Sequence, residues 1–127
     1  MATITVRTIA ALAAALGLAA CGTSDAGEPH RTVAGGDAGR GERAIGKFGC
    51  GSCHVIPGIR EAKGMVGPPL TSFGRRTYIA GEVSNTPEHL IVWIEVPQSI
   101  EPGTAMPNLG VSDQEARDIA AYLYTLR

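Results

Sequence analysis

The sequence is poor in aromatic residues, in cysteine and in long apolar runs. Only 5% of its 127 residues are aromatic, and all of these lie between Phe48 and Tyr124. No apolar run reaches the roughly 20 residues that a membrane-spanning helix needs, and three cysteines are too few for a disulfide-dense scaffold. The net charge of −1 lacks the basic excess that is typical of nucleic-acid-binding proteins. These shortages argue against a nucleic-acid partner, a disulfide scaffold and a mature membrane-spanning segment.

Glycine, in contrast, is abundant. The chain has 17 glycines, well above the typical share of about 7%. The few aromatic residues are a thin stock for the core of a domain of roughly 90 residues, because small domains bury the smallest fraction of their surface. The composition therefore predicts either a loose fold or a core that is completed by a group other than an amino acid.

The first 20 residues have the features of an export signal. Residues 8–20 form an apolar stretch behind Arg7, which suits a secretory signal peptide and is too short to span a membrane. Small residues precede Cys21, and this arrangement resembles the lipobox of bacterial lipoproteins, in which the cysteine is acylated and becomes the first residue. We expect Cys21 to be lipidated and to anchor the protein. A plain signal peptide cleaved near Ala20 is the alternative.

The segment that follows changes composition. Residues 21–37 are mostly small or polar, so they cannot bury enough apolar surface to offset the entropy cost of ordering. We therefore expect a flexible tether over 21–37 and a folded domain over 38–127.

One motif carries metal chemistry, the C-x-x-C-H at Cys50-Gly51-Ser52-Cys53-His54. Two cysteines three positions apart on a helical turn can each add to a vinyl group of haem, and the adjacent His54 then presents its imidazole to the iron. The pattern favours a covalent c-type haem. A thioredoxin-like dithiol would need a strand–helix context that the sequence does not show, and a zinc site would need two further ligands, of which only His89 is available.

A c-type haem iron also needs a sixth ligand or an open site, and the candidates are Met65, Met106, His89 and His30. Met106 lies in a loop, residues 101–107, whose two prolines and glycine make it rigid enough to hold a thioether against a metal. Met65 is expected to fill a gap in a glycine-rich loop, and His89 and His30 are expected to be solvated surface residues.

Further segments match one family in order: Gly41 and Ile45 before the haem motif, Gly67-Pro68-Pro69-Leu70 after it, Pro-Gly-Thr-Ala-Met-Pro at 102–107, and Ile-Ala-Ala-Tyr-Leu at 119–123. The chain from about Asp37 to Arg127 resembles a class I cytochrome c, a monohaem electron carrier. The resemblance implies one covalent haem c, with His54 and Met106 as axial iron ligands. It also implies that the Pro68 carbonyl accepts the Nδ1 proton of His54, which would fix the imidazole tautomer.

An all-α fold is expected, with N- and C-terminal helices that cross near Gly41 and Tyr122 around the haem. Helices are predicted over about 39–48, over 86–96 with Thr86 as N-cap, and after a capping box that starts at Ser112. No segment alternates convincingly as a strand. Three residues of the last helix are expected to face water: Glu115, Arg117 and Asp118.

The haem pocket is expected to use apolar residues from most of these segments: Phe48, Leu70, Ile79, Leu90, Trp93, Ile94, Leu109 and Leu123. Polar candidates for the haem propionates are Arg75, Arg76, Tyr78, Asn85 and Trp93. For most of these residues an exposed or core position is an equally good interpretation.

More narrowly, the segments at 80–81, 85–88 and 106–107, with Trp93 and Pro97, resemble the cytochrome domain fused to subunit II of some bacterial terminal oxidases. We expect the domain to differ from that arrangement by standing alone behind the lipobox, without the fused membrane and copper-binding parts. An iron held by imidazole and thioether is coordinatively saturated in both oxidation states, so it exchanges one electron with little rearrangement.

We therefore expect a lipid-anchored electron carrier on the periplasmic side of a bacterial membrane, which serves a membrane redox complex such as a terminal oxidase or a quinol-oxidising complex. Two alternatives are a fixed haem subunit of a larger respiratory or dehydrogenase complex, and a haem enzyme or gas sensor if Met106 does not bind the iron. No carboxylate pair, catalytic triad or phosphate loop points to an enzyme.

Overall fold

The computed structural model of the protein describes residues 31–127. In chain order its elements are α1 (Ala38–Lys47), η1 (Cys50–Ser52), η2 (Phe73–Arg75), β1 (Tyr78–Ile79), β2 (Val83–Ser84), α2 (Pro87–Glu95), η3 (Pro97–Ser99) and α3 (Asp113–Leu123). The predicted signal peptide, Cys21 and His30 lie outside the described residues. Within residues 31–127, no helix has the length and apolar character needed to cross a membrane.

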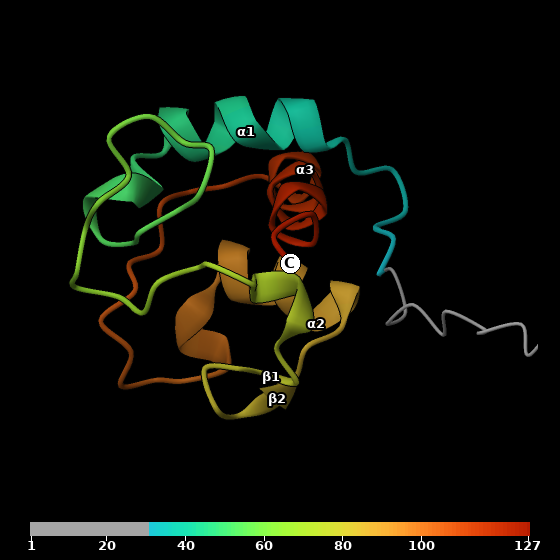
Figure 1. Ribbon diagram of the computed structural model, residues 1–127. Helices are drawn as coiled ribbons and strands as arrows, with labels where there is room; N and C mark the ends of the chain where they lie inside the picture. Colours follow the sequence, from blue (N-terminus) through green and yellow to red (C-terminus); the bar gives the residue numbers. More distant parts are fainter. Residues whose placement is uncertain (1–30) are drawn as a thin grey trace, which may run out of the picture.

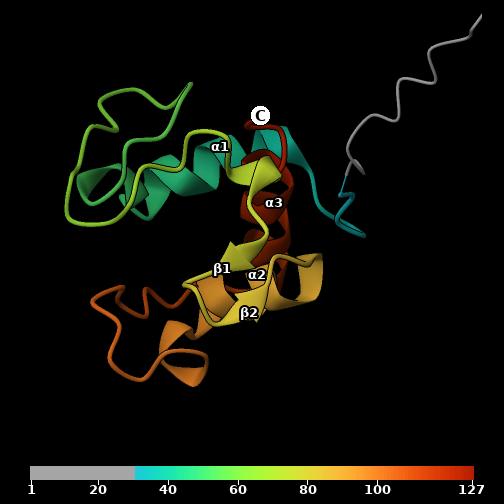
Figure 2. The ribbon, with the colours of Figure 1, turned by 60° about the horizontal axis from the view of Figure 1, so that its bottom comes forward.

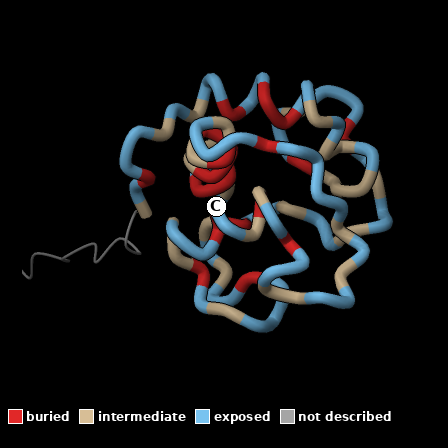
Figure 3. Tube along the Cα trace, turned by 180° about the vertical axis from the view of Figure 1, so that it is seen from behind, coloured by how far each residue is buried: buried red, intermediate tan, exposed pale blue. Residues whose placement is uncertain are grey.

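The crossing of α1 over α3 organises the fold, as the sequence predicts (Figure 1). Gly41 lies at the crossing, and a Cβ atom placed on it would come within 2.6 Å of the Asp118 carbonyl carbon and 3.0 Å of the Tyr122 Cβ. Only a residue without a side chain allows this approach. Buried residues are concentrated on α3, which is the central element of the core (Figure 3).

The three predicted helices are confirmed, and their ends follow from local chemistry. Thr86 accepts a hydrogen bond from the His89 N–H, and Pro87 occupies the first turn of α2. The Ser112 side chain and the Glu115 side chain form the predicted capping box at the start of α3. These bonds satisfy backbone N–H groups that have no partner inside the helix.

Asp118 differs from the sequence prediction, because it is 3% exposed rather than solvated. Its carboxylate accepts two hydrogen bonds from Arg40, each 2.8 Å long, and one from the backbone N–H of Asp37. Gln114 donates a further bond of 3.0 Å. The close crossing of α1 over α3 places the start of α1 directly over Asp118, and helix periodicity alone does not reveal this. The bond from Arg40 lowers the pKa of Asp118, with smaller contributions from Asp37 and Gln114.

The described part of the predicted tether, residues 31–37, packs against the domain instead of extending away from it. Val33 is 9% exposed, and the Arg31 guanidinium donates a 2.6 Å hydrogen bond to the Gly74 carbonyl. Gln114 and Arg117 of α3 donate to carbonyls in the same segment. The small residues that suggested flexibility let the chain lie close to α3 instead. We call residues 31–37 the N-terminal strap.

Residues 31–127 also contain a short antiparallel hairpin, although no strand was predicted there. Tyr78 pairs with Ser84 and Ile79 with Val83. Two residues per strand are too few to show an alternating pattern. The turn between them uses positive φ angles at Ala80 and Gly81.

Candidate functional site

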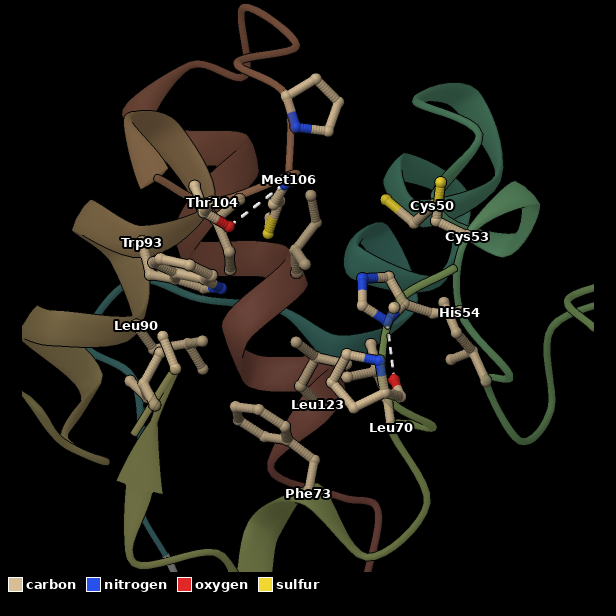
Figure 4. Close-up of a pocket in the computed structure, with 18 of the residues that line it drawn as sticks. Cys50, Cys53, His54, Leu70, Phe73, Leu90, Trp93, Thr104, Met106 and Leu123 are labelled. Carbon is tan, nitrogen blue, oxygen red and sulfur yellow. Dashed lines mark hydrogen bonds between the residues drawn. The ribbon is translucent and has the colours of Figure 1, made fainter. Parts of the chain in front are cut away.

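A cavity of about 770 Å³ lies beside α3 and is walled mainly by apolar side chains. Residues of the segment after α1 and of the segment between η3 and α3 line it. Figure 2 shows these two segments on the same side of α3, the first at the top of the view and the second at the bottom. Both segments are largely irregular, so the helices position the walls while loops supply the reactive groups. Figure 4 shows the labelled side chains that point into this space.

Cys50, Cys53 and His54 line the same side of the cavity. Gly49 ends the first helix with a left-handed φ of 68°, and η1 begins directly after it. The N–H groups of Cys53 and His54 both donate to the Cys50 carbonyl, at 3.2 and 3.0 Å. This single turn brings two free thiols and an imidazole together. Burial raises the pKa of the Cys50 thiol.

The imidazole of His54 has a fixed orientation. Its Nδ1 lies 2.7 Å from the Pro68 carbonyl oxygen, as the resemblance implied. A carbonyl can only accept, so Nδ1 carries the proton and Nε2 keeps its lone pair available for a metal. Gly67 packs against the ring, and a Cβ placed there would lie 2.7 Å from Nδ1. Gly67 and Pro68 thus fix the orientation of the imidazole ring.

Met106 lines the cavity from the loop between η3 and α3, on the side away from the cysteines (Figure 4). Its backbone N–H donates a 3.1 Å bond to the Thr104 hydroxyl, and its carbonyl accepts a 2.8 Å bond from the Gln98 side chain. The structure therefore brings an imidazole and a thioether to one cavity from two separate segments.

Of the other three ligand candidates, Met65 and His89 do not line the cavity, and His30 lies outside the described residues. Met65 is 89% exposed, so the expectation that it fills a gap is wrong. His89 is exposed, as expected, and its Nδ1 lies 2.9 Å from the Ser84 carbonyl oxygen.

Most of the predicted pocket residues do line the cavity: Phe48, Leu70, Tyr78, Ile79, Leu90, Trp93, Ile94, Leu109 and Leu123. Several other lining residues were not predicted from the sequence: Ile45, Ile56, Phe73, Val111 and Ile119. Ile45 and Ile119 occupy the apolar faces of their helices, so periodicity could have found them. Phe73 and Val111 lie outside the main helices, and no local pattern marks them.

The prediction that Asn85 contributes to the haem pocket is wrong, because Asn85 does not line the cavity. It is 3% exposed, and its amide donates to the carbonyls of Phe73 and Arg76 at 3.3 and 3.0 Å. The Tyr124 hydroxyl donates to its side-chain oxygen at 3.0 Å. Both ends of the amide are therefore used to join η2 to the end of α3, and Asn85 is a structural residue. The hydrogen bond from Tyr124 to Asn85 thus joins buried polar groups from separate parts of the chain.

Comparison with known proteins decides between haem, a dithiol pair and zinc. A sequence model of cytochrome c matches residues 38–127. The chain belongs to the cytochrome c family. As a class I c-type cytochrome it is an electron-carrier haem protein with a covalent, iron-containing haem c.

Curated relatives of this cytochrome include two proteins named cytochrome c oxidase subunit 2. The one from Alkalihalophilus pseudofirmus is 35% identical over 79% of this chain and 28% of its own length. The one from Bacillus subtilis is 33% identical over 69% of this chain and 26% of its own length. The cytochrome thus spans about a quarter of the length of the relatives it matches. Among solved structures, cytochrome c2 from Rhodobacter sphaeroides is 19% identical over 72% of this chain and 96% of that chain, with a TM-score of 0.49.

Few polar residues line the cavity of this cytochrome, and Arg76 is one of them. Its guanidinium donates to the Pro69 carbonyl and lies 5.3 Å from the centre of the Phe73 ring. Desolvation lowers the pKa of Arg76. Arg75, the neighbouring candidate, is not among the residues that line the cavity. A cation held beside an apolar cavity fits a cofactor that carries carboxylates.

Proposed function

We propose that Cys50 and Cys53 attach the haem as thioethers, and that His54 and Met106 are its axial iron ligands. The observation that carries this proposal is that two thiols, an imidazole with Nε2 free, and a thioether line one apolar cavity. Haem bound here would supply one-electron exchange at its iron. Pro68 and Gly67 hold the His54 ring in one orientation, so the ring would need little reorientation to bind the iron.

The remaining cavity residues have two roles in this proposal. The apolar side chains exclude water from the cofactor, and the polar ones near Arg76 hold its propionates. We assign the propionate contacts to Arg76, Tyr78 and Trp93, because all three line the cavity. The other two sequence candidates, Arg75 and Asn85, do not.

The protein acts, in our proposal, as a lipid-anchored, extracytoplasmic electron carrier that serves a terminal oxidase. The names of the relatives support this, since both are called cytochrome c oxidase subunit 2. The lipobox-like segment that ends at Cys21 supports an anchor. Because the domain matches part of larger chains, a fixed haem subunit of a larger respiratory complex is the second candidate.

Replacing Met106 with alanine tests the ligand assignment, and Met65→Ala is the matched control because Met65 is exposed. We expect Met106→Ala alone to lose the weak ferric absorption band at the red edge of the visible spectrum and to bind cyanide or carbon monoxide rapidly. If the native protein binds these ligands as fast as the variant, Met106 is not the sixth ligand. A haem enzyme or gas sensor would then be favoured.

Cys21→Ser tests the anchor in cells. The variant should move from the membrane fraction to the soluble periplasm, and retention in the membrane would contradict lipidation. Purification from detergent-solubilised membranes then separates the two roles. A mobile carrier should separate from the oxidase and reduce or oxidise it at a rate that depends on its concentration, whereas a fixed subunit should co-purify in constant ratio.

A further inference from the structure

The segment that carries Met106 has no regular secondary structure between η3 and α3. Among the described residues, 105–110 take part in no backbone–backbone hydrogen bond. The Met106 backbone is therefore held by hydrogen bonds from side chains.

Two side chains make those bonds, one on each side of the residue. The Thr104 hydroxyl accepts from the Met106 N–H at 3.1 Å, and this contact is local to the loop. The Gln98 amide donates to the Met106 carbonyl at 2.8 Å from eight positions upstream. Gln98 therefore ties the loop to a different element of the fold, η3.

Gln98 is well placed for this because η3 is firmly held at the end of α2. Pro97 is among the fully buried side chains, and its carbonyl accepts hydrogen bonds from both Ile100 and Glu101, at 3.1 and 3.0 Å. The Ser99 hydroxyl donates to the Val96 carbonyl at 2.7 Å. The backbone on both sides of Gln98 is fixed, while its side chain is free to reach the loop.

We propose that Gln98 is a positioning residue that keeps the Met106 thioether directed into the cavity. It acts on the ligand through the Met106 backbone and does not line the cavity itself. The proposal rests on the proposed ligation of iron by Met106. A single neutral hydrogen bond shifts a local opening equilibrium by roughly 2- to 10-fold. Loss of the Gln98 bond should raise the population of the Met106-displaced form by this factor.

The test measures cyanide binding to the ferric holoprotein, because cyanide can bind only when Met106 leaves the iron. Gln98→Ala removes the donor, and Gln98→Glu keeps the shape but replaces the donating amide by an acceptor. Both should bind cyanide roughly 2- to 10-fold faster than the native protein. Gln98→Lys restores a donor and should recover part of the native rate.

Gln114→Ala is the matched control, since Gln114 also donates its amide to a backbone carbonyl, that of Gly35, at 2.9 Å. It should lower stability without changing the cyanide rate. Native-like rates in both Gln98→Ala and Gln98→Glu would overturn the proposal, as would an equal increase in Gln114→Ala. The ligand assignment fails separately, if Met106→Ala binds cyanide no faster than the native protein, and the Gln98 proposal then falls with it.

Discussion

Replacement of Gly41 with alanine places a methyl group at the narrowest point of the contact between α1 and α3. The new Cβ would lie 2.6 Å from the Asp118 carbonyl carbon, and that carbonyl's oxygen is nearer still. Carbon atoms in contact normally lie about 3.5–4.0 Å apart, so the helices must separate by about 1 Å. The obstacle is backbone, which cannot rotate away as a flexible side chain can.

Two effects of opposite sign decide the outcome. Alanine is favoured over glycine inside a helix by about 1 kcal/mol. Overpacking a tight contact costs about 1–3 kcal/mol, and a gap of 0.5–1 Å elsewhere in the interface forfeits a quarter to a half of each contact energy. Because the clash is with rigid backbone, we take the upper part of this range. An overpacking cost of about 2–3 kcal/mol less a propensity gain of about 1 kcal/mol means that the free energy of unfolding should fall by about 1–2 kcal/mol in Gly41→Ala.

Gly46 provides the matched control within the same helix. It is exposed, and no atom lies within 4 Å of a Cβ placed on it. Gly46→Ala should therefore gain the helix propensity alone and become more stable by about 0.5–1 kcal/mol. Urea unfolding of the holoproteins, followed by far-ultraviolet circular dichroism, measures both changes. Equal stabilisation of the two alanine variants would refute the close crossing.

Three further predictions concern the imidazole, the N-terminal strap and acid stability. Gly67→Ala should displace the His54 ring, because the new Cβ would lie 2.7 Å from Nδ1; a ferric spectrum and reduction potential equal to those of the native protein would contradict this. Val33→Ala should lower the free energy of unfolding by about 1–2 kcal/mol, whereas a flexible tether predicts no change in urea unfolding. The bond from Lys47 is the main cause that lowers the pKa of Glu115 from 4.5 to about 2. The folded state thus holds this carboxylate more acidic than the unfolded state, so its stabilisation is full above pH 4.5 and is lost as pH falls toward 2. Glu115→Gln should flatten the acid limb of stability against pH, and an unchanged limb would show that the pair with Lys47 does not contribute.

The helix ends could be predicted because their causes are local. The Thr86 cap, Pro87 in the first turn and the capping box at Ser112 each involve residues within four positions of one another. The haem motif is equally local, since a single turn brings the thiols of Cys50 and Cys53 together with His54. Features that depend on a single turn can therefore be predicted from the order of the residues alone.

Several residues predicted wrongly have partners far along the chain. Asp118 has the helix position of a solvated residue, but its partner Arg40 lies 78 positions away. Asn85 suits a polar contact in the pocket, yet its carboxamide oxygen accepts from Tyr124, 39 positions away. The N-terminal strap has the composition of a tether, and only its contacts with α3 make it part of the domain.

The sequence by itself determined the cofactor chemistry, the helices and the candidate ligands, because each depends on residue type and short spacing. The low content of aromatic residues already indicated a core completed by something other than amino acids, and family membership identifies this group as haem c. The tertiary structure decided which side chains share the cavity, which polar groups are used up in packing, and how Gln98 reaches the Met106 backbone. These depend on contacts between residues far apart in the chain, and the distances across a fold are set by all of its contacts together.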